Sequence, residues 1–237
     1  MKPVIFFDAD DTLWSTAALY HEVKQKYEDL LRGVGIDDPK LLVRLDELDV
    51  SRVPQHGFTI DRFIGSMVLL YEQLSSECQY PVYLSVVERI RLLGETLRQP
   101  PVLFDDTIPV LTRLSESYRL VLVTAGDYHH QTEKVRATGV AHFFRGVRIL
   151  PVKTVETVAP VVQGLGVDPS ECWFVGNSPR SDIVPALELG MKAILIKRST
   201  WVYDQAFPEG YEPNRSRFWE VESLTDAMNI ILQGGSP

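Results

Sequence analysis

The chain has 237 residues, a hydrophobic fraction of 45% and a formal net charge of -8 at pH 7, which are ordinary values for a globular protein with a sizeable core. The acidic balance argues against a dedicated nucleic-acid binder, because no basic patch stands out to hold a phosphate backbone. A local cationic pocket can still hold a small phosphorylated substrate. No apolar stretch reaches membrane-spanning length, and the first apolar run begins too early for a signal peptide to precede it. We therefore expect a cytoplasmic protein that binds neither nucleic acid nor a membrane.

A short apolar run opens the chain and is followed at once by three carboxylates. Residues 3–7 have the continuous hydrophobic pattern of a strand covered on both faces, and Asp8, Asp10 and Asp11 come next. A turn and a helix N-cap would explain Asp11, but not Asp8 and Asp10 together. Side chains at positions i and i+2 of an extended segment lie on the same side, so these two carboxylates can converge on one ion or substrate.

Residues 15–99 have helical periodicity throughout, with apolar side chains recurring every three or four positions. No strand pattern interrupts this segment, which predicts an all-helical body of four helices. The residues that mark the successive helices are Leu19, Val23, Tyr27 and Leu30; Leu41, Leu42, Leu45 and Leu48; Ile60, Phe63, Ile64, Met67 and Tyr71; and Val82, Val86, Val87, Ile90 and Leu93.

Beyond Pro100, short β-rich apolar runs alternate with helical segments, which is typical of a parallel sheet with right-handed crossovers. Strands are predicted over 119–124, 146–150, 172–176 and 192–196. Helices are predicted near 128–138, 154–165, 181–189 and 222–232, with a loop packed on the core over 199–219.

The simplest architecture places the strand over 3–7 in the same sheet. The fold class is then α/β, with a Rossmann-like parallel sheet and helices on both faces formed by residues 1–14 and 100–237. An all-helical cap domain, residues 15–99, is inserted after the first strand. Ligands of open α/β folds bind at the carboxyl edge of the sheet, where this insertion begins, so we expect the insertion to act as a lid.

Polar or small residues follow three further predicted strands. They are Thr124 with Ala125 and Gly126, then Lys153, then Asn177 with Asp182. Each group taken alone is also what an ordinary turn or a surface lysine looks like. Brought to one edge of a parallel sheet with the first carboxylate pair, they would bind a divalent cation through oxygen atoms. They would also hold a phosphate through a hydroxyl, amides and an ammonium group.

At this point the sequence resembles the haloacid dehalogenase superfamily of phosphotransferases, in its phosphatase-type form with a helical cap. The resemblance covers the whole chain in order. The motifs that carry it are DxDxT at Asp8, Asp10 and Thr12, the threonine Thr124, the lysine Lys153, and "GNSPRSD" from Gly176 to Asp182.

The resemblance implies that Asp8 is the nucleophile that forms an aspartyl-phosphate. Asp10 would protonate the leaving oxygen and then activate the hydrolytic water. Thr124 and the amides of Ala125 and Gly126 would hold the transferring phosphoryl group. Lys153, another residue of the phosphate site, would neutralise this group and Asp8.

The resemblance also implies a Mg²⁺ site formed by the Asp8 carboxylate, the Asp10 backbone carbonyl, Asn177 and Asp182. Which of Asn177 and Asp182 is the direct ligand stays open. The fourth motif usually begins Gly-Asp, and the amide of Asn177 therefore removes one negative charge from the metal site. The proline that usually follows the lysine is here Thr154.

The predicted function is a Mg²⁺-dependent phosphomonoester hydrolase acting on a small phosphorylated metabolite. A phosphomutase would share the same core. A metal-independent 2-haloacid dehalogenase lacks the second aspartate of the first motif, so Asp10 argues against that activity. A catalytically silent binding or regulatory protein is a further alternative, against which the complete motif set argues. No motif within 15–99 identifies the substrate, and no feature predicts the oligomeric state.

Overall fold

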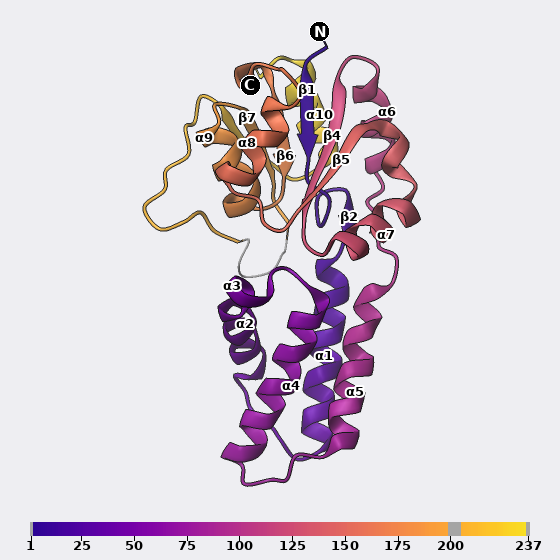
Figure 1. Cartoon of the computed structure of the whole chain (residues 1–237), viewed down its shortest axis with the longest axis vertical. Coiled ribbons are helices and arrows are strands. Elements are labelled where there is room, and N and C mark those ends of the chain that lie inside the picture. Colours follow the sequence, from indigo (N-terminus) through magenta and orange to yellow (C-terminus); the bar gives the residue numbers. More distant parts are fainter. Residues whose placement is uncertain (1, 199–204, 236–237) are drawn as a thin grey trace. The chain divides into compact units, whose positions relative to one another are not determined.

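The computed structural model describes residues 2–198 and 205–235. Backbone proximity divides the chain into two compact units (Figure 1). The core unit comprises residues 1–16 and 100–237, and the helical unit comprises residues 17–99.

Among the described residues, a six-stranded sheet in the order β5-β4-β1-β6-β7-β8 forms the centre of the core unit. Neighbouring strands are parallel throughout, which confirms the predicted sheet and places the first strand in its interior. The strands are β1 (Val4–Phe7), β4 (Arg119–Ala125), β5 (Phe144–Leu150), β6 (Trp173–Gly176), β7 (Lys192–Ile196) and β8 (Phe218–Val221).

Helices cover both faces of this sheet, as predicted. Phe7 and Leu122 belong to a hydrophobic cluster with side chains of α6, α7 and α10, whereas Phe6 and Val121 belong to a cluster with side chains of α8 and α9. Successive residues of a strand point to opposite faces, so burial of both faces explains the unbroken apolar run of β1. The helices are α6 (Thr107–Ser115), α7 (Tyr128–Thr138), α8 (Val155–Gln163), α9 (Val184–Glu188) and α10 (Leu224–Leu232).

Shorter elements complete the core unit. The two-residue strand β2 (Trp14–Ser15) pairs antiparallel with β3 (Val102–Leu103). Two 3₁₀ helices, η2 (Val140–Phe143) and η3 (Pro169–Glu171), precede β5 and β6, and a π-helical turn, η4 (Pro179–Ile183), leads into α9.

Apart from the short elements β2, β3, η2 and η3, two elements of the core unit, β8 and α6, go beyond the predicted ones. The predicted loop over 199–219 is wrong at its end, where β8 begins at Phe218; residues 199–204 of this loop lie outside the described residues. In β8 only the two end residues are buried, so this short strand has no regular alternation. No helix is predicted over the residues of α6, although its buried Val110, Leu111 and Leu114 have helical spacing.

The helical unit consists of helices around one hydrophobic core that includes the fully buried Phe63 and Tyr71. Within it, α1, α4 and α5 run alongside one another (Figure 1). Its elements are α1 (Ala17–Gly33), α2 (Leu41–Ser51), α3 (Val53–His56), α4 (Ile60–Glu77), α5 (Leu84–Glu95) and the 3₁₀ helix η1 (Thr96–Arg98). The four helices predicted from periodicity are therefore present. In the described part of the chain, no helix is long and apolar enough to cross a bilayer.

Candidate active site

Buried polar residues lie at the carboxyl ends of neighbouring strands of the core unit. Asp8 directly follows β1, Asn177 directly follows β6, and Thr124 is the last residue but one of β4. Lys153 lies just beyond the end of β5. All four residues are at most 7% exposed. Because these strands are parallel neighbours, their carboxyl ends bring the four residues to one edge of the sheet.

Lys153 forms ion pairs with two carboxylates at this edge. Its Nζ lies 2.5 Å from Asp182 Oδ1 and is in contact with Asp8 Oδ1. The side chains of all three residues are at most 6% exposed. A buried ammonium between two buried carboxylates offsets their mutual repulsion and part of the cost of removing them from water.

Two carboxylates share one ammonium here, and this affects the pKa of Asp8 and the pKa of Lys153. Burial raises the pKa of Asp8, Lys153 opposes this effect and Asp182 adds to it, so the Asp8 pKa lies above its ordinary range. Burial would lower the pKa of Lys153, but the Asp182 and Asp8 carboxylates more than offset this, so its pKa is raised. Lys153 therefore stays charged, and a further positive charge beside Asp8 would favour the ionised nucleophile.

Asn177 lies beside the Asp8 carboxylate and the backbone of Asp10. With its amide nitrogen directed inward, Asn177 donates to the Asp10 backbone oxygen at 3.0 Å, to Asp8 Oδ2 at 3.2 Å and to Thr12 Oγ1 at 3.3 Å. Rotation of the amide by half a turn would present its oxygen at the same place. A carboxylate, a backbone carbonyl and an amide oxygen form a hard-oxygen donor set that fits Mg²⁺.

Asp182 is engaged elsewhere in this arrangement. One of its carboxylate oxygens lies next to Lys153, and the other accepts a hydrogen bond from the Ser178 backbone N–H at 2.9 Å. In the described part of the chain, no group of three or more His, Cys, Asp or Glu side chains gathers as a metal site. A cation here would therefore depend on the Asp10 carbonyl and the Asn177 amide, in addition to Asp8.

The side chain of Asp10 turns toward partners that sequence reasoning did not identify. Lys134 Nζ lies 2.6 and 2.8 Å from its two carboxylate oxygens, and Gln131 Nε2 and Trp14 Nε1 donate to them at 2.8 and 2.6 Å. Burial acts to raise the pKa of Asp10, but the charge and hydrogen bonds of Lys134, with those of Gln131 and Trp14, hold it below its ordinary value. Lys153 and Lys134 thus each neutralise one aspartate of the first motif.

The predicted phosphate loop follows β4. Thr124 is 1% exposed, and Gly126 has a backbone φ of +131°, a conformation that favours glycine. The Gly126 N–H donates to the Leu150 carbonyl at 2.9 Å, which continues the pairing of β4 with β5. Asp127 caps α7 by accepting a hydrogen bond from the His130 N–H. The Gly126 N–H is therefore engaged with the end of β5, and binding of a phosphate by Thr124, Ala125 and Gly126 stays a prediction.

Thr154, which replaces the usual proline after Lys153, has a structural role. It is the N-cap of α8 and forms a capping box with Thr157, whose hydroxyl accepts from the Thr154 N–H at 2.9 Å. This contact fixes the junction at which Lys153 stands.

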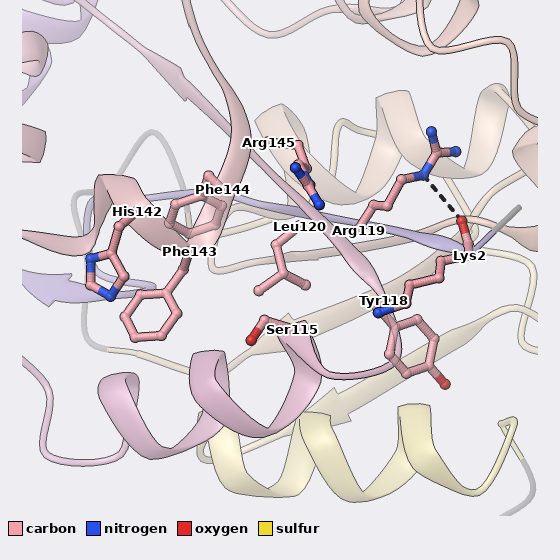
Figure 2. A pocket seen from close by; sticks show the side chains of 9 residues that line it. All are labelled: Lys2, Ser115, Tyr118, Arg119, Leu120, His142, Phe143, Phe144 and Arg145. Atoms are coloured by element: carbon pink, nitrogen blue, oxygen red, sulfur yellow. Dashed lines mark hydrogen bonds between the residues drawn. The ribbon is translucent and has the colours of Figure 1, made fainter.

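A cavity of about 630 Å³ lies elsewhere in the core unit, at the amino ends of β4 and β5. Figure 2 shows its lining, in which no carboxylate side chain takes part. The carboxyl ends of the same strands carry Thr124 and lead to Lys153, so this cavity is separate from the polar cluster around Asp8.

The sequence of the chain matches a family model. The model of the haloacid dehalogenase-like hydrolases matches residues 2–190. The chain belongs to this family of hydrolases. The match includes all residues of the polar cluster, from Asp8 to Asp182.

Curated relatives of the chain are phosphatases. The glyceraldehyde 3-phosphate phosphatase of Pyrococcus abyssi is 29% identical over 244 residues, which cover 98% of this chain and 94% of that protein. The N-acylneuraminate-9-phosphatase of Mus musculus is 35% identical over 107 residues. That second match spans 43% of this chain and 43% of the mouse protein, less than half of either.

Solved structures share the fold. A haloacid dehalogenase-like family hydrolase from Xanthomonas campestris superposes with a TM-score of 0.80 at 22% identity, over 98% of this chain and 95% of that one. A HAD-hydrolase from Bacillus subtilis, bound to magnesium and reported to reveal interdomain movement, has a TM-score of 0.66 at 17% identity, over 98% of this chain and 99% of that one.

Proposed function

We propose that this hydrolase is a Mg²⁺-dependent phosphatase that cleaves the phosphomonoester of a small metabolite through an aspartyl-phosphate. The observation that carries the proposal is the pair of aspartates of the first motif, each in contact with a different lysine. Asp8 contacts Lys153, and Asp10 contacts Lys134. A nucleophile and a separate acid/base group are what phosphoryl transfer to a carboxylate requires.

In the first step a carboxylate oxygen of Asp8 forms a bond to phosphorus while the ester P–O bond breaks. The negative charge of the bound phosphate would disfavour the ionised form of Asp10, so that Asp10 would enter this step protonated. The leaving oxygen takes this proton, Asp10 becomes a carboxylate, and the alcohol departs. Thr124 and the Ala125 amide would hold the phosphoryl oxygens, and Lys153 would balance their charge. In the second step Asp10 accepts a proton from water, the water oxygen bonds to phosphorus, and the bond between Asp8 and phosphorus breaks to release phosphate.

We propose that Mg²⁺ is held by the Asp8 carboxylate, the Asp10 backbone carbonyl and the Asn177 side chain. When bound, it supplies positive charge that lowers repulsion between the nucleophile and the phosphate. Asp182 would act indirectly, since its two oxygens are engaged with Lys153 and the Ser178 N–H. The magnesium-bound relative from Bacillus subtilis supports the choice of metal.

We propose that the helical unit, residues 17–99, is a cap that closes over bound substrate, as the sequence predicts for residues 15–99. Crystal structures with and without a phosphate analogue would test this. The two units should change their relative orientation, and identical arrangements in both states would contradict the proposal. The interdomain movement reported for the Bacillus subtilis relative supports this choice of test.

The experiment that tests the function is a screen of phosphorylated metabolites with Mg²⁺, read as released phosphate. The panel should include glyceraldehyde 3-phosphate and an N-acylneuraminate 9-phosphate, because relatives are named for these substrates. Asp8→Asn serves as the inactive control. Halide release from 2-haloacids without metal, with no phosphate release from any ester, would overturn the proposal.

A further inference from the structure

The carboxylate of Asp10 has hydrogen-bond donors at both of its oxygens. Oδ1 accepts from Trp14 Nε1 at 2.6 Å and from Lys134 Nζ at 2.6 Å. Oδ2 accepts from Gln131 Nε2 and from Lys134 Nζ, both at 2.8 Å. The donors come from two elements, β2 and α7, so the carboxylate is fixed from two directions.

We propose that Gln131 and Lys134 are positioning residues, which hold the Asp10 carboxylate in the orientation needed for proton transfer. The inference rests on the proposed phosphatase function, in which Asp10 is the acid and base. It adds two residues of α7 to the machinery, neither of which belongs to the motifs that carry the family resemblance.

The geometry of α7 explains how one helix can serve this purpose. Gln131 and Lys134 are three residues apart and therefore share one face of the helix. The hydrogen bond that the His130 N–H donates to the Asp127 carboxylate fixes where the helix begins. Gln131 Nε2 also donates to the Ala125 carbonyl at 2.9 Å. The same amide thus joins the acid/base carboxylate to the loop that would hold the phosphate.

The burial of these groups is consistent with a site that meets substrate. The Lys134 side chain is 9% exposed, whereas the Asp10 side chain is 29% exposed. Among the described residues, Lys134 forms its ion pair with Asp10. A buried ammonium without a carboxylate is costly. The alternative to a positioning role is therefore a purely structural one, in which Asp10 neutralises Lys134. The experiment must therefore separate a role in catalysis from a role in stability.

The dependence of the rate on the leaving group separates the two roles. An alkyl phosphate needs protonation of its leaving oxygen, whereas an aryl phosphate with an acidic phenol departs with little help from an acid. The value of kcat/KM reports the first transfer up to departure of the alcohol. A residue that positions the acid should therefore matter for the alkyl ester and hardly for the aryl ester.

The test compares Lys134→Met and Gln131→Leu, each in the wild-type and the Asp10→Asn backgrounds, with p-nitrophenyl phosphate and the best alkyl phosphate of the screen. We expect Lys134→Met to lower kcat/KM for the alkyl ester by about 10–100-fold, a part of the worth of a positioned acid. For the aryl ester, kcat/KM should fall less than about threefold. In the Asp10→Asn background, Lys134→Met should lower kcat/KM less than about threefold for either ester, because the effects of coupled residues are non-additive. Lys134→Arg should restore much of the loss.

Equal losses for both esters, or the same loss in the Asp10→Asn background, would overturn the proposal. If Lys134→Met folds poorly, Gln131→Leu provides a second test, because it removes a neutral hydrogen-bond donor to Asp10 and leaves the charge of Lys134 in place. A crystal structure of either variant gives an answer that does not depend on activity. Displacement of the Asp10 carboxylate is expected, and an unchanged carboxylate in both variants would contradict the positioning role. Failure of the wild-type protein to hydrolyse any phosphate ester would instead count against the proposed function.

Discussion

The Asp182 carboxylate lies directly against the backbone of Gly176, so closely that a β-carbon at position 176 would stand 2.3 Å from Asp182 Oδ2. The same carboxylate contacts Lys153, which in turn contacts Asp8. The absence of a side chain at Gly176 therefore determines where Lys153 can stand. The glycine that opens the fourth motif is required by packing, with no demand for an unusual backbone conformation.

Gly176→Ala should displace Asp182 and with it the ammonium of Lys153. We expect a loss of about 1–3 kcal/mol in the free energy of unfolding, as for other overpacked sites, and a large fall in phosphatase activity. The sequence has no tryptophan within residues 17–99, and Trp14, Trp173 and Trp219 lie in the core unit. Tryptophan fluorescence in a denaturant titration would therefore report on the core unit. Gly146→Ala lies in the same core unit, where a β-carbon meets only the guanidinium end of the Arg148 side chain, at 3.1 Å. It is the matched control and should change neither quantity appreciably.

Asp8→Asn should abolish phosphate release and leave the fold intact. An amide oxygen is too weak a nucleophile to form the acyl-phosphate, while the size of the side chain is preserved. The measurement is phosphate release with saturating Mg²⁺, together with circular dichroism of the purified variant. Near-normal turnover by a well-folded Asp8→Asn protein would remove Asp8 from the role of nucleophile.

The strand-end residues of the site could be found from sequence for a physical reason. Asp8, Lys153 and Asn177 each follow an apolar run, and parallel strands bring such positions to one edge whatever the details of the helices. Gln131 and Lys134 could not be found in this way. They lie inside a helix, and the face that α7 turns toward Asp10 depends on its packing against the sheet.

The direction of the Asp10 side chain was also beyond sequence reasoning. The alternation of an extended segment suggested that the Asp8 and Asp10 carboxylates converge on one ion. In the structure the chain turns after Asp8, and Asp11 has a positive φ of 57°. The Asp10 carboxylate consequently faces Lys134, while its backbone carbonyl faces Asn177. The carbonyl, implied by the family resemblance, is the group of Asp10 that shares the Asn177 amide with Asp8 Oδ2.

A buried ion pair supports the helical unit. Arg62 donates from Nε and Nη2 to the two carboxylate oxygens of Asp49, each at 2.9 Å, and Ser66 donates to the same carboxylate at 2.9 Å. The side chains of Asp49 and Arg62 are 2% and 5% exposed. Removal of one partner would leave an unpaired buried charge.

Asp49→Ala should therefore destabilise the helical unit by about 3–5 kcal/mol. Hydrogen exchange measured on peptides within residues 41–77 would detect this, because tryptophan fluorescence does not report on this unit. Lys26→Ala removes an exposed ion pair with Glu22 in the same unit and should have little effect. Equal protection of the 41–77 peptides in Asp49→Ala and in wild type would show that the pair does not stabilise the unit.

Asn177 replaces a carboxylate at the proposed metal site, so Asn177→Asp tests that site directly. The added negative charge would lie near a cation held by Asp8 Oδ2 and the Asp10 carbonyl, the groups that Asn177 now contacts at 3.2 and 3.0 Å. Two unit charges 4 Å apart interact by about 4 kcal/mol at an effective dielectric constant of 20. Repulsion from Asp8 and the lost hydration of the new carboxylate should cancel most of this gain. We expect the half-saturating Mg²⁺ concentration to fall about tenfold, equivalent to about 1.4 kcal/mol.

The measurement is a Mg²⁺ titration of phosphatase activity for wild type and Asn177→Asp. The exposed Asn214 permits the same substitution elsewhere in the core unit, and Asn214→Asp should leave the Mg²⁺ dependence unchanged. A shift in Asn177→Asp alone would support a local contact with the metal, since a change of overall net charge affects both variants equally. An unchanged or raised half-saturating concentration would show that Asn177 is not a ligand. Asp182 would then have to leave Lys153 or the Ser178 N–H to supply that contact.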